Sequence, residues 1–179
     1  MRKIFFLILL VGFFYACQED VKPTVDKDLA PGDELPTQES WNSEIYLTEA
    51  GLLKAIVYSD HIQAYEEKKA TYLEGVKIDF YTPEGVKSSQ LTSKRGRLDD
   101  ATKNMYAIDS VVAVNDSGTV LETDELMWEN KTQKIKTDKF VTITTDVEKI
   151  EGYGFESDQG LEHYTIYDIT YSTRLDKKK

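Results

Sequence analysis

The chain of 179 residues contains a single cysteine, Cys17, and two histidines, His61 and His163. A lone cysteine cannot form a disulfide within the chain. The two histidines lie far apart in the sequence, and neither has a cysteine or a second histidine at the compact spacing that a zinc site requires. The sequence therefore predicts neither a metal site nor a cofactor.

Basic residues are also scarce, since 22 lysines and arginines stand against 32 aspartates and glutamates, for a formal net charge of −10 at pH 7. Nucleic-acid binding depends mainly on lysine and arginine contacts to phosphate, so this charge argues against it. The same charge opposes broad adhesion to anionic lipid headgroups. Residues 176–179, which end in three lysines, are expected to form a solvated basic tail.

Groups with catalytic spacing are missing as well. The paired carboxylates Asp99–Asp100 and Glu66–Glu67 are adjacent in sequence, so on a strand or turn they point apart, and turn chemistry already explains them. The segment Gly152–Gly154 lacks the third glycine and the helix of a dinucleotide-binding loop; glycine in a strand pattern more often marks a bulge or a close approach. No nucleophile has an evident base. The sequence predicts no catalytic residue, and hence a protein that is not an enzyme.

No apolar run is long enough to span a membrane. The longest, Ile4–Ala16, holds 13 residues, whereas a spanning helix needs about 20. It follows Arg2 and Lys3 and ends directly before Cys17, which gives the three parts of a secretory signal. The run resembles a bacterial lipoprotein signal. That resemblance implies removal of residues 1–16 and acylation of Cys17 as a lipid anchor; an ordinary signal peptide with a chance cysteine is the alternative.

A change of composition separates the leader from the rest. The segment Gln18–Gln38 holds three of the four prolines, six acidic residues and almost no large apolar side chains. Such a segment cannot bury enough surface to offset the entropy of ordering it. We therefore predict a flexible tether over residues 17–41, followed by one domain over residues 42–175, which is long enough to have a core of its own.

The predicted domain shows period-two alternation. In Val76–Phe80, for example, the apolar residues share one face, and Lys77 and Asp79 are expected on the opposite, solvent-exposed face. Polar turns recur about every 30 residues, near residues 66–69, 99–104, 130–134 and 157–160. A strand–turn–strand unit cannot cover its own apolar face, so neighbouring units must stack. The sequence predicts an all-β fold of stacked antiparallel hairpins, a folded-over (twisted) β-jelly-roll with an apolar groove. A closed barrel is the alternative.

The apolar and aromatic side chains assigned to the inner face would leave a wide, irregular interior, which is typical of sites for apolar ligands. Plain core packing is the alternative for each of them. The candidate lipid-binding groove comprises Tyr58, Ile62, Tyr72, Val76, Ile78, Phe80, Tyr106, Ile108, Val112, Val114, Leu126, Trp128, Ile135, Val141, Ile143, Phe155 and Ile166.

The last predicted strand carries aromatic or apolar side chains in both phases. It lacks the proline or inward lysine that usually protects a sheet edge, so this edge is either an aggregation hazard or a site where a partner docks by strand pairing. The candidate partner edge comprises Tyr164, Thr165, Ile166, Tyr167, Ile169 and Tyr171.

A family resemblance runs through Thr123–Asn130, Ile135–Thr137, Val141–Ile143 and Ile150–Leu161. Together these segments resemble the periplasmic domain of the LptC family of lipopolysaccharide-export proteins, and more loosely its relative LptA. The resemblance is strongest over residues 91–169. The best-known members carry a membrane-spanning helix where this chain has the short run that ends at Cys17.

With the anchor that the lipoprotein-signal resemblance implies at acylated Cys17, the LptC resemblance implies a periplasmic component held at the inner membrane. It would receive lipopolysaccharide from an inner-membrane ABC transporter and pass it to an LptA-like bridge. The alternative is a structural or adhesive envelope lipoprotein whose β-repeats form a solid core and bind only protein. The two hypotheses differ in whether the interior of the domain is hollow.

Overall fold

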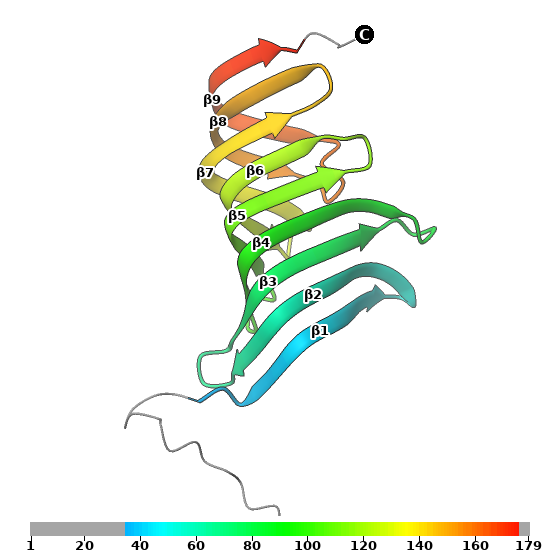
Figure 1. Ribbon diagram of the computed structural model, residues 1–179, viewed down its shortest axis with the longest axis vertical. Coiled ribbons are helices and arrows are strands. Elements are labelled where there is room, and N and C mark those ends of the chain that lie inside the picture. Colours follow the sequence, from blue (N-terminus) through cyan, green and yellow to red (C-terminus); the bar gives the residue numbers. More distant parts are fainter. Residues whose placement is uncertain (1–34, 176–179) are drawn as a thin grey trace, which may run out of the picture. The chain divides into compact units, whose positions relative to one another are not determined.

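The computed structural model describes residues 35–175, which form an all-β domain (Figure 1). Its strands are β1 (Gln38–Glu49), β2 (Leu52–Tyr65), β3 (Ala70–Tyr81), β4 (Lys87–Asp99), β5 (Met105–Asn115), β6 (Val120–Glu129), β7 (Lys134–Thr144), β8 (Glu148–Ser157) and β9 (Tyr164–Arg174). They form one antiparallel sheet in sequence order, and β1 and β9 each pair on one side only. The predicted all-β class is confirmed, and the closed-barrel alternative is wrong.

The first strand begins at Gln38, before the expected start of the domain at residue 42. The backbone N–H of Thr37 donates to the carbonyl of Ala64 at 2.8 Å, and the Trp41 ring stacks on His61 with centroids 5.2 Å apart. Strand pairing and this stacking extend the ordered sheet into the last residues of the predicted tether. Residues 1–34, which include Cys17 and most of the predicted tether, and residues 176–179 lie outside the described residues.

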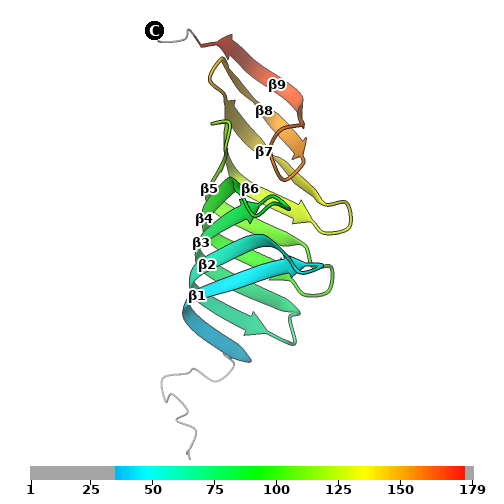
Figure 2. The same cartoon turned by 90° about the vertical axis from the view of Figure 1, so that its right-hand side faces the viewer.

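Each strand bends near its middle, so the sheet folds over into two facing arms (Figures 1 and 2). In the pairs from β4–β5 to β8–β9 the pairing register shifts near the middle of the strands, for example between Thr92 and Arg95 and between Ile108 and Val111. Extra residues on one strand of a pair produce such a bend. At the bend of β3, Gly75 has φ +59°, and a Cβ there would lie 2.0 Å from the Asp60 carboxylate. Glycine is therefore favoured at this position, because any other residue would displace the Asp60 side chain and adopt a left-handed backbone.

The two arms are named by their turns. Arm 1 ends in the turns at residues 50–51, 82–86, 116–119 and 145–147. Arm 2 ends in the turns at residues 66–69, 100–104, 130–133 and 158–163. The arm 2 turns are the recurring polar segments predicted from the sequence. This agreement confirms the predicted stack of hairpins, because each repeat contributes one strand pair.

Buried hydroxyl groups accompany the bends on alternate strands. The Oγ of Ser59 lies 2.8 Å from the carbonyl oxygen of Glu74, the Oγ of Ser93 lies 2.9 Å from that of Arg95, and the Oγ1 of Thr123 lies 2.8 Å from that of Phe140. A bulge frees backbone carbonyls from the ladder, and a buried carbonyl without a partner is costly. The hydroxyls supply those partners from within the bent strands.

The main core lies between the arms over β4–β8. It combines arm 1 residues such as Leu121 and Ile143 with arm 2 residues such as Leu126 and Phe155, each at most 2% exposed. Residues from opposite arms thus pack face to face, as two stacked sheets do. The connection between β8 and β9 adds Leu161 to this cluster.

One expectation about the outer face needs correction. Asp79 does lie on the face opposite Ile78, but it is only 6% exposed. The Nζ of Lys87 lies 2.6 Å from its Oδ1 and the Nζ of Lys77 lies 3.4 Å from its Oδ2. Strand alternation predicts the face of a residue and says nothing about neighbours that cover it. Asp79 is therefore a buried ion-pair partner, not a freely solvated residue.

Candidate functional site

Most of the predicted groove residues face the interior between the arms. The pairing register aligns Val57, Ile78 and Leu91 with Ala113, Leu121 and Ile143 in one inner row of arm 1. A similar row in arm 2 runs from Ile62 and Leu73 through Ala107 to Leu126. The inward groove candidates are Ile62, Val76, Ile78, Phe80, Leu126, Trp128, Ile135, Val141, Ile143, Phe155 and Ile166.

The structure corrects the face expected for the remaining six groove candidates. In β5 the buried positions are Ala107, Val111 and Ala113, so the larger neighbours that alternate with them point outward. The same alternation and pairing place the β2 and β3 candidates outside. The outward residues are Tyr58, Tyr72, Tyr106, Ile108, Val112 and Val114.

Contacts on the outer face support this placement. The Nζ of Lys77 lies 4.7 Å from the centre of the Tyr58 ring, and the guanidinium of Arg97 lies 4.2 Å from that of Tyr106. Large side chains were predicted to face the interior, but in β5 small alanines occupy the inner positions. Side-chain size therefore predicted the wrong face of β5, because a closely packed interior accommodates alanine.

An apolar cavity of about 140 Å³ lies on the inner face of β1–β5. Three predicted groove residues line it, Ile62, Val76 and Tyr106, together with Val57 and Leu73. Tyr106 borders the cavity although its ring packs on Arg97 at the outer face. The cavity is also lined by residues that were not predicted from the sequence, namely Ile45, Leu47, Val57, Leu73, Leu98 and Met105. Strand alternation could have indicated these residues, because they have the same alternation phase as the inward residues on the paired strands.

A second cavity, of about 320 Å³, opens between the rims of the two arms. Lys54 and Phe80 line it from the arm 1 side, and Trp128, Asn130 and Gln133 line it from the arm 2 side. Leu47 and Met105 line both cavities. The second cavity, called the mouth below, therefore adjoins the apolar interior of β1–β5 and provides a route from solvent.

The interior beyond the mouth is filled, not hollow. Val141, Ile143 and Phe155 are at most 1% exposed, and Leu161 packs with them from the β8–β9 connection. The phenol of Tyr164 is half-buried against Phe155, with ring centroids 6.1 Å apart, and this burial raises its pKa above the ordinary value. The domain thus combines an open interior at β1–β5 with a solid one at β5–β9.

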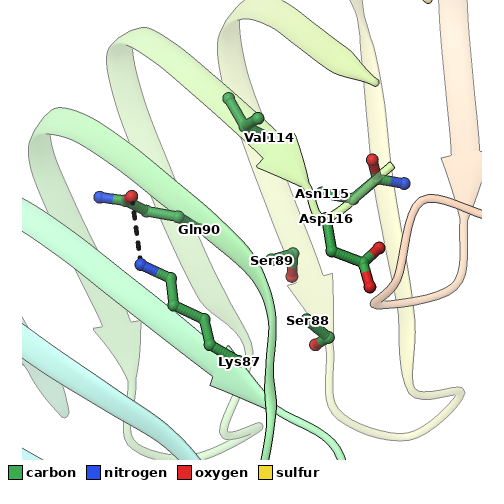
Figure 3. A pocket seen from close by; sticks show the side chains of 7 residues that line it. All are labelled: Lys87, Ser88, Ser89, Gln90, Val114, Asn115 and Asp116. Atoms are coloured by element: carbon green, nitrogen blue, oxygen red, sulfur yellow. Dashed lines mark hydrogen bonds between the residues drawn. The ribbon is translucent and has the colours of Figure 1, made fainter. Parts of the chain in front are cut away.

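A polar pocket of about 260 Å³ lies on arm 1 between β4 and β5 (Figure 3). The Nζ of Lys87 donates to the Oε1 of Gln90 at 3.3 Å on its β4 side. Ser89 and Asn115, which also line it, have side chains that reach the β8–β9 connection. This pocket adjoins the filled half of the interior.

A carboxylate–lysine cluster joins neighbouring strands on the outer face of arm 2. The Nζ of Lys136 lies 2.8 Å from the Oε2 of Glu129 and 3.7 Å from the Oε2 of Glu156. The hydrogen bond from Lys136 holds the pKa of Glu129 below its ordinary value, and the Thr132 hydroxyl adds to this. The same bond raises the pKa of Lys136. The cluster stabilises the sheet and lies outside the groove.

The predicted partner edge is strand β9, which pairs only with β8. Tyr164 and Ile166 pack against the core, whereas Tyr167, Ile169 and Tyr171 are exposed. Thr165 pairs with Glu156. The opposite edge, β1, likewise carries exposed Trp41 and Tyr46. Both ends of the sheet therefore present unpaired backbone groups beside exposed aromatic side chains.

Neither a metal centre nor a membrane span is found between residues 35 and 175. No three histidine, cysteine, aspartate or glutamate side chains in that range are grouped so as to hold a metal ion. The same range holds no helix with the length and apolarity needed to cross a membrane.

Comparison with known proteins adds one match. The model of a family described as "Lipopolysaccharide-assembly, LptC-related" matches residues 4–171. The matched range covers all of the described strands up to Tyr171 in β9 and nearly the whole chain. No curated protein matches the chain.

Proposed function

Because the chain belongs to the lipopolysaccharide-assembly, LptC-related family, we propose that it receives lipopolysaccharide from an inner-membrane ABC transporter and passes it to an LptA-like bridge. Family membership implies a role in lipopolysaccharide transport, as a non-enzymatic component associated with the periplasm and the inner membrane. The direction of transfer, the lipid anchor and docking through β9 are the parts that we add.

The observation that carries the proposal is the apolar cavity inside β1–β5, next to the mouth between the arms. Acyl chains would enter the cavity beside Ile62 and Leu73, while the saccharide stays in water at the mouth, near Asn130 and Gln133. Burial of each CH₂ contributes about 0.8 kcal/mol, so the part of an acyl chain that the cavity holds adds to the affinity without a charged contact. Binding of this kind is non-covalent and reversible.

Photo-crosslinking tests this proposal. A photoreactive residue at Ile62, which lines the cavity, should capture lipopolysaccharide supplied in vesicles. The matched control is the same residue at Ile108, on the outer face of β5, where no lipid should be captured. Equal capture at the two positions, or none at Ile62 in a folded protein, would contradict a lipid site on the inner face.

Anchoring through Cys17 is the second part of the proposal. Its support is the order of Arg2 and Lys3, the run Ile4–Ala16 and the cysteine that follows. Mass spectrometry of the membrane-bound protein should find Cys17 as the first residue, carrying acyl chains. Cys17→Ala should release a folded domain from membranes, since the residue lies outside the sheet domain. An intact Met1 or an unmodified cysteine would refute the anchor.

Docking through β9 is the third part. Its support is the unpaired edge with exposed Tyr167, Ile169 and Tyr171. A partner strand added there would extend the sheet and continue its inner face into the next protein. Proline at Thr165 or Thr170 removes a backbone donor, and at least one of these variants should block pull-down of the LptA-like partner. Normal binding by both folded variants would place docking elsewhere.

A further inference from the structure

The β8–β9 connection differs from the other turns of arm 2. Those turns bond along their own rim: the N–H of Asp100 donates to the carbonyl of Lys69 at 2.8 Å, and that of Asn130 to the Oδ1 of Asn104 at 3.0 Å. Residues 158–163 instead reach the opposite arm. We call these residues the strap.

Two side chains of arm 1 hold the strap. The Nδ2 of Asn115, at the end of β5, donates to the carbonyl of Gly160 at 3.1 Å. The Oγ of Ser89, near the start of β4, donates to the carbonyl of Gln159 at 3.4 Å. Figure 3 shows both residues side by side on arm 1. Since the strap begins on arm 2, it bridges the two rims of the folded sheet.

The third attachment is Leu161, which is only 3% exposed within the core. Its φ of +54° lies in the left-handed region, which is unfavourable for a residue with a bulky side chain. Burial of the Leu161 side chain and the hydrogen bonds to Gln159 and Gly160 therefore offset the backbone strain at Leu161. Such a segment is stable while docked and gains backbone freedom when released.

The strap also has a structure of its own. The Oδ1 of Asp158 accepts from the backbone N–H of Glu162 at 3.1 Å, and its Oδ2 lies 3.0 Å from the Nδ1 of His163. The Oγ of Ser157 donates to the carbonyl of His163 at 3.2 Å. These bonds stay within the strap and Ser157, the last residue of β8. Release from arm 1 therefore breaks the contacts of Ser89, Asn115 and Leu161 and leaves the internal bonds intact.

The strap lies at the boundary between the open and the filled interior. Gln159 lines the mouth, and Leu161 lies in the core that fills β5–β9. We propose that the strap is a gate: acyl chains rest in the cavity of β1–β5, and they reach the β9 end only when Leu161 withdraws. This inference rests on the proposed lipid-carrying function and assigns a place to the resting lipid and to the step that releases it.

The variant Asn115→Asp tests the gate with little change of shape. The Oδ1 of Asn115 accepts from the Ser117 hydroxyl at 2.7 Å and from the Thr119 N–H at 2.9 Å, and an aspartate retains both bonds. The aspartate replaces the Nδ2 donor by an oxygen, and this oxygen repels the carbonyl oxygen of Gly160. The matched control is Asp116→Asn, a polar swap at the next, exposed residue. Leu161→Ala is a second opening variant, which removes the buried side chain.

The readout is the ratio of lipopolysaccharide crosslinked at Ile166 in β9 to that crosslinked at Ile62 in the cavity. Loss of one hydrogen bond, at about 1 kcal/mol, should raise this ratio about fivefold in Asn115→Asp. Asp116→Asn should leave it unchanged, and Leu161→Ala should raise it as well. Hydrogen exchange at the strap amides, measured in the same samples, should quicken in the two opening variants.

The outcomes distinguish failure of the gate from failure of the proposed lipid-binding function. A ratio unchanged in both opening variants, although the strap amides exchange faster, would overturn the gate and leave lipid binding intact. Capture of lipopolysaccharide at Ile166 as strong as that at Ile62 in the unaltered protein would also overturn the gate, since the strap would then block nothing. No capture at Ile62 in any variant would refute the proposed lipid site itself.

Discussion

The Nζ of Lys87 lies 2.6 Å from the Oδ1 of Asp79, a carboxylate that strand packing buries on the outer face of the sheet. Among the described residues, no donor makes a hydrogen bond of good geometry to the Oδ1 of Asp79. The ion pair with Lys87 is therefore the polar contact that this oxygen makes. The Nζ of Lys77 approaches the other oxygen at 3.4 Å. Asp79 is thus held between two lysines whose own side chains remain partly in solvent.

The first prediction follows from this pair. Asp79→Lys places a third ammonium group between Lys77 and Lys87 in a buried position and should lower the free energy of unfolding by about 1–3 kcal/mol. The control Asp138→Lys changes the same charge on a side chain that is 84% exposed and should cost less than about 0.5 kcal/mol. Urea unfolding measures both. Equal costs would mean that burial of Asp79 has no energetic effect.

The second prediction concerns the pairing of the last two strands. A Cβ on Gly152 would lie 2.5 Å from the carbonyl oxygen of Asp168 and 3.0 Å from the Cα of Ile169. Gly152→Ala should therefore push β9 away from β8, with a cost of about 1–3 kcal/mol, and speed hydrogen exchange in β9. Gly160→Ala meets its nearest atom at 3.5 Å and serves as the control. Unchanged exchange in Gly152→Ala would contradict the close approach.

The third prediction concerns the hydroxyls at the bends. Thr123→Val preserves the shape of the side chain but leaves the carbonyl of Phe140 without its donor, 2.8 Å away. The expected loss of stability is about 1–3 kcal/mol, measured by urea unfolding. Thr142→Val, on the outer face of β7, should cost less than about 0.5 kcal/mol. A neutral Thr123→Val would show that water satisfies the carbonyl instead.

The fourth prediction is a dependence of stability on pH. The pKa of Glu129 is lower in the folded protein than its ordinary value of 4.5, because Lys136 donates a hydrogen bond to its carboxylate. The stabilisation is therefore present above pH 4.5 and is lost as the pH falls through the lowered folded-state pKa. Lys136→Met should reduce the loss of stability on acidification below pH 4.5. High salt should weaken the effect, since the cluster is at the surface.

A control for the pH prediction is Lys139→Met, which removes a lysine from an exposed pair with Asp138 at 3.3 Å. It should leave the acid side of the stability profile unchanged. At high pH the dependence runs the other way. The pKa of Lys136 is raised above 10.5 in the folded protein, so the stabilisation from Lys136 is lost as the pH rises above 10.5 through the folded-state pKa. A profile identical in Lys136→Met and the unaltered protein would contradict the coupling.

The sequence by itself determined the class of fold. Alternation in segments such as Val76–Phe80 and polar turns about 30 residues apart predicted stacked antiparallel hairpins, because strand geometry and turn chemistry are local properties. The family resemblance over residues 91–169 was confirmed by the match to residues 4–171. The buried positions Leu126, Ile143 and Phe155 also followed from alternation alone.

Only the tertiary structure decided where the sheet bends, which phase of β5 is inward and where the interior is open. Local pattern cannot show that alanines face inward beside Tyr106, since that depends on how close the opposite arm lies. Nor can it show that Asn115 of arm 1 bonds to Gly160 of the strap, or that Leu161 of the strap packs into the core between the arms. These contacts join residues far apart in sequence, so packing between the two arms, and not backbone preference, determines them.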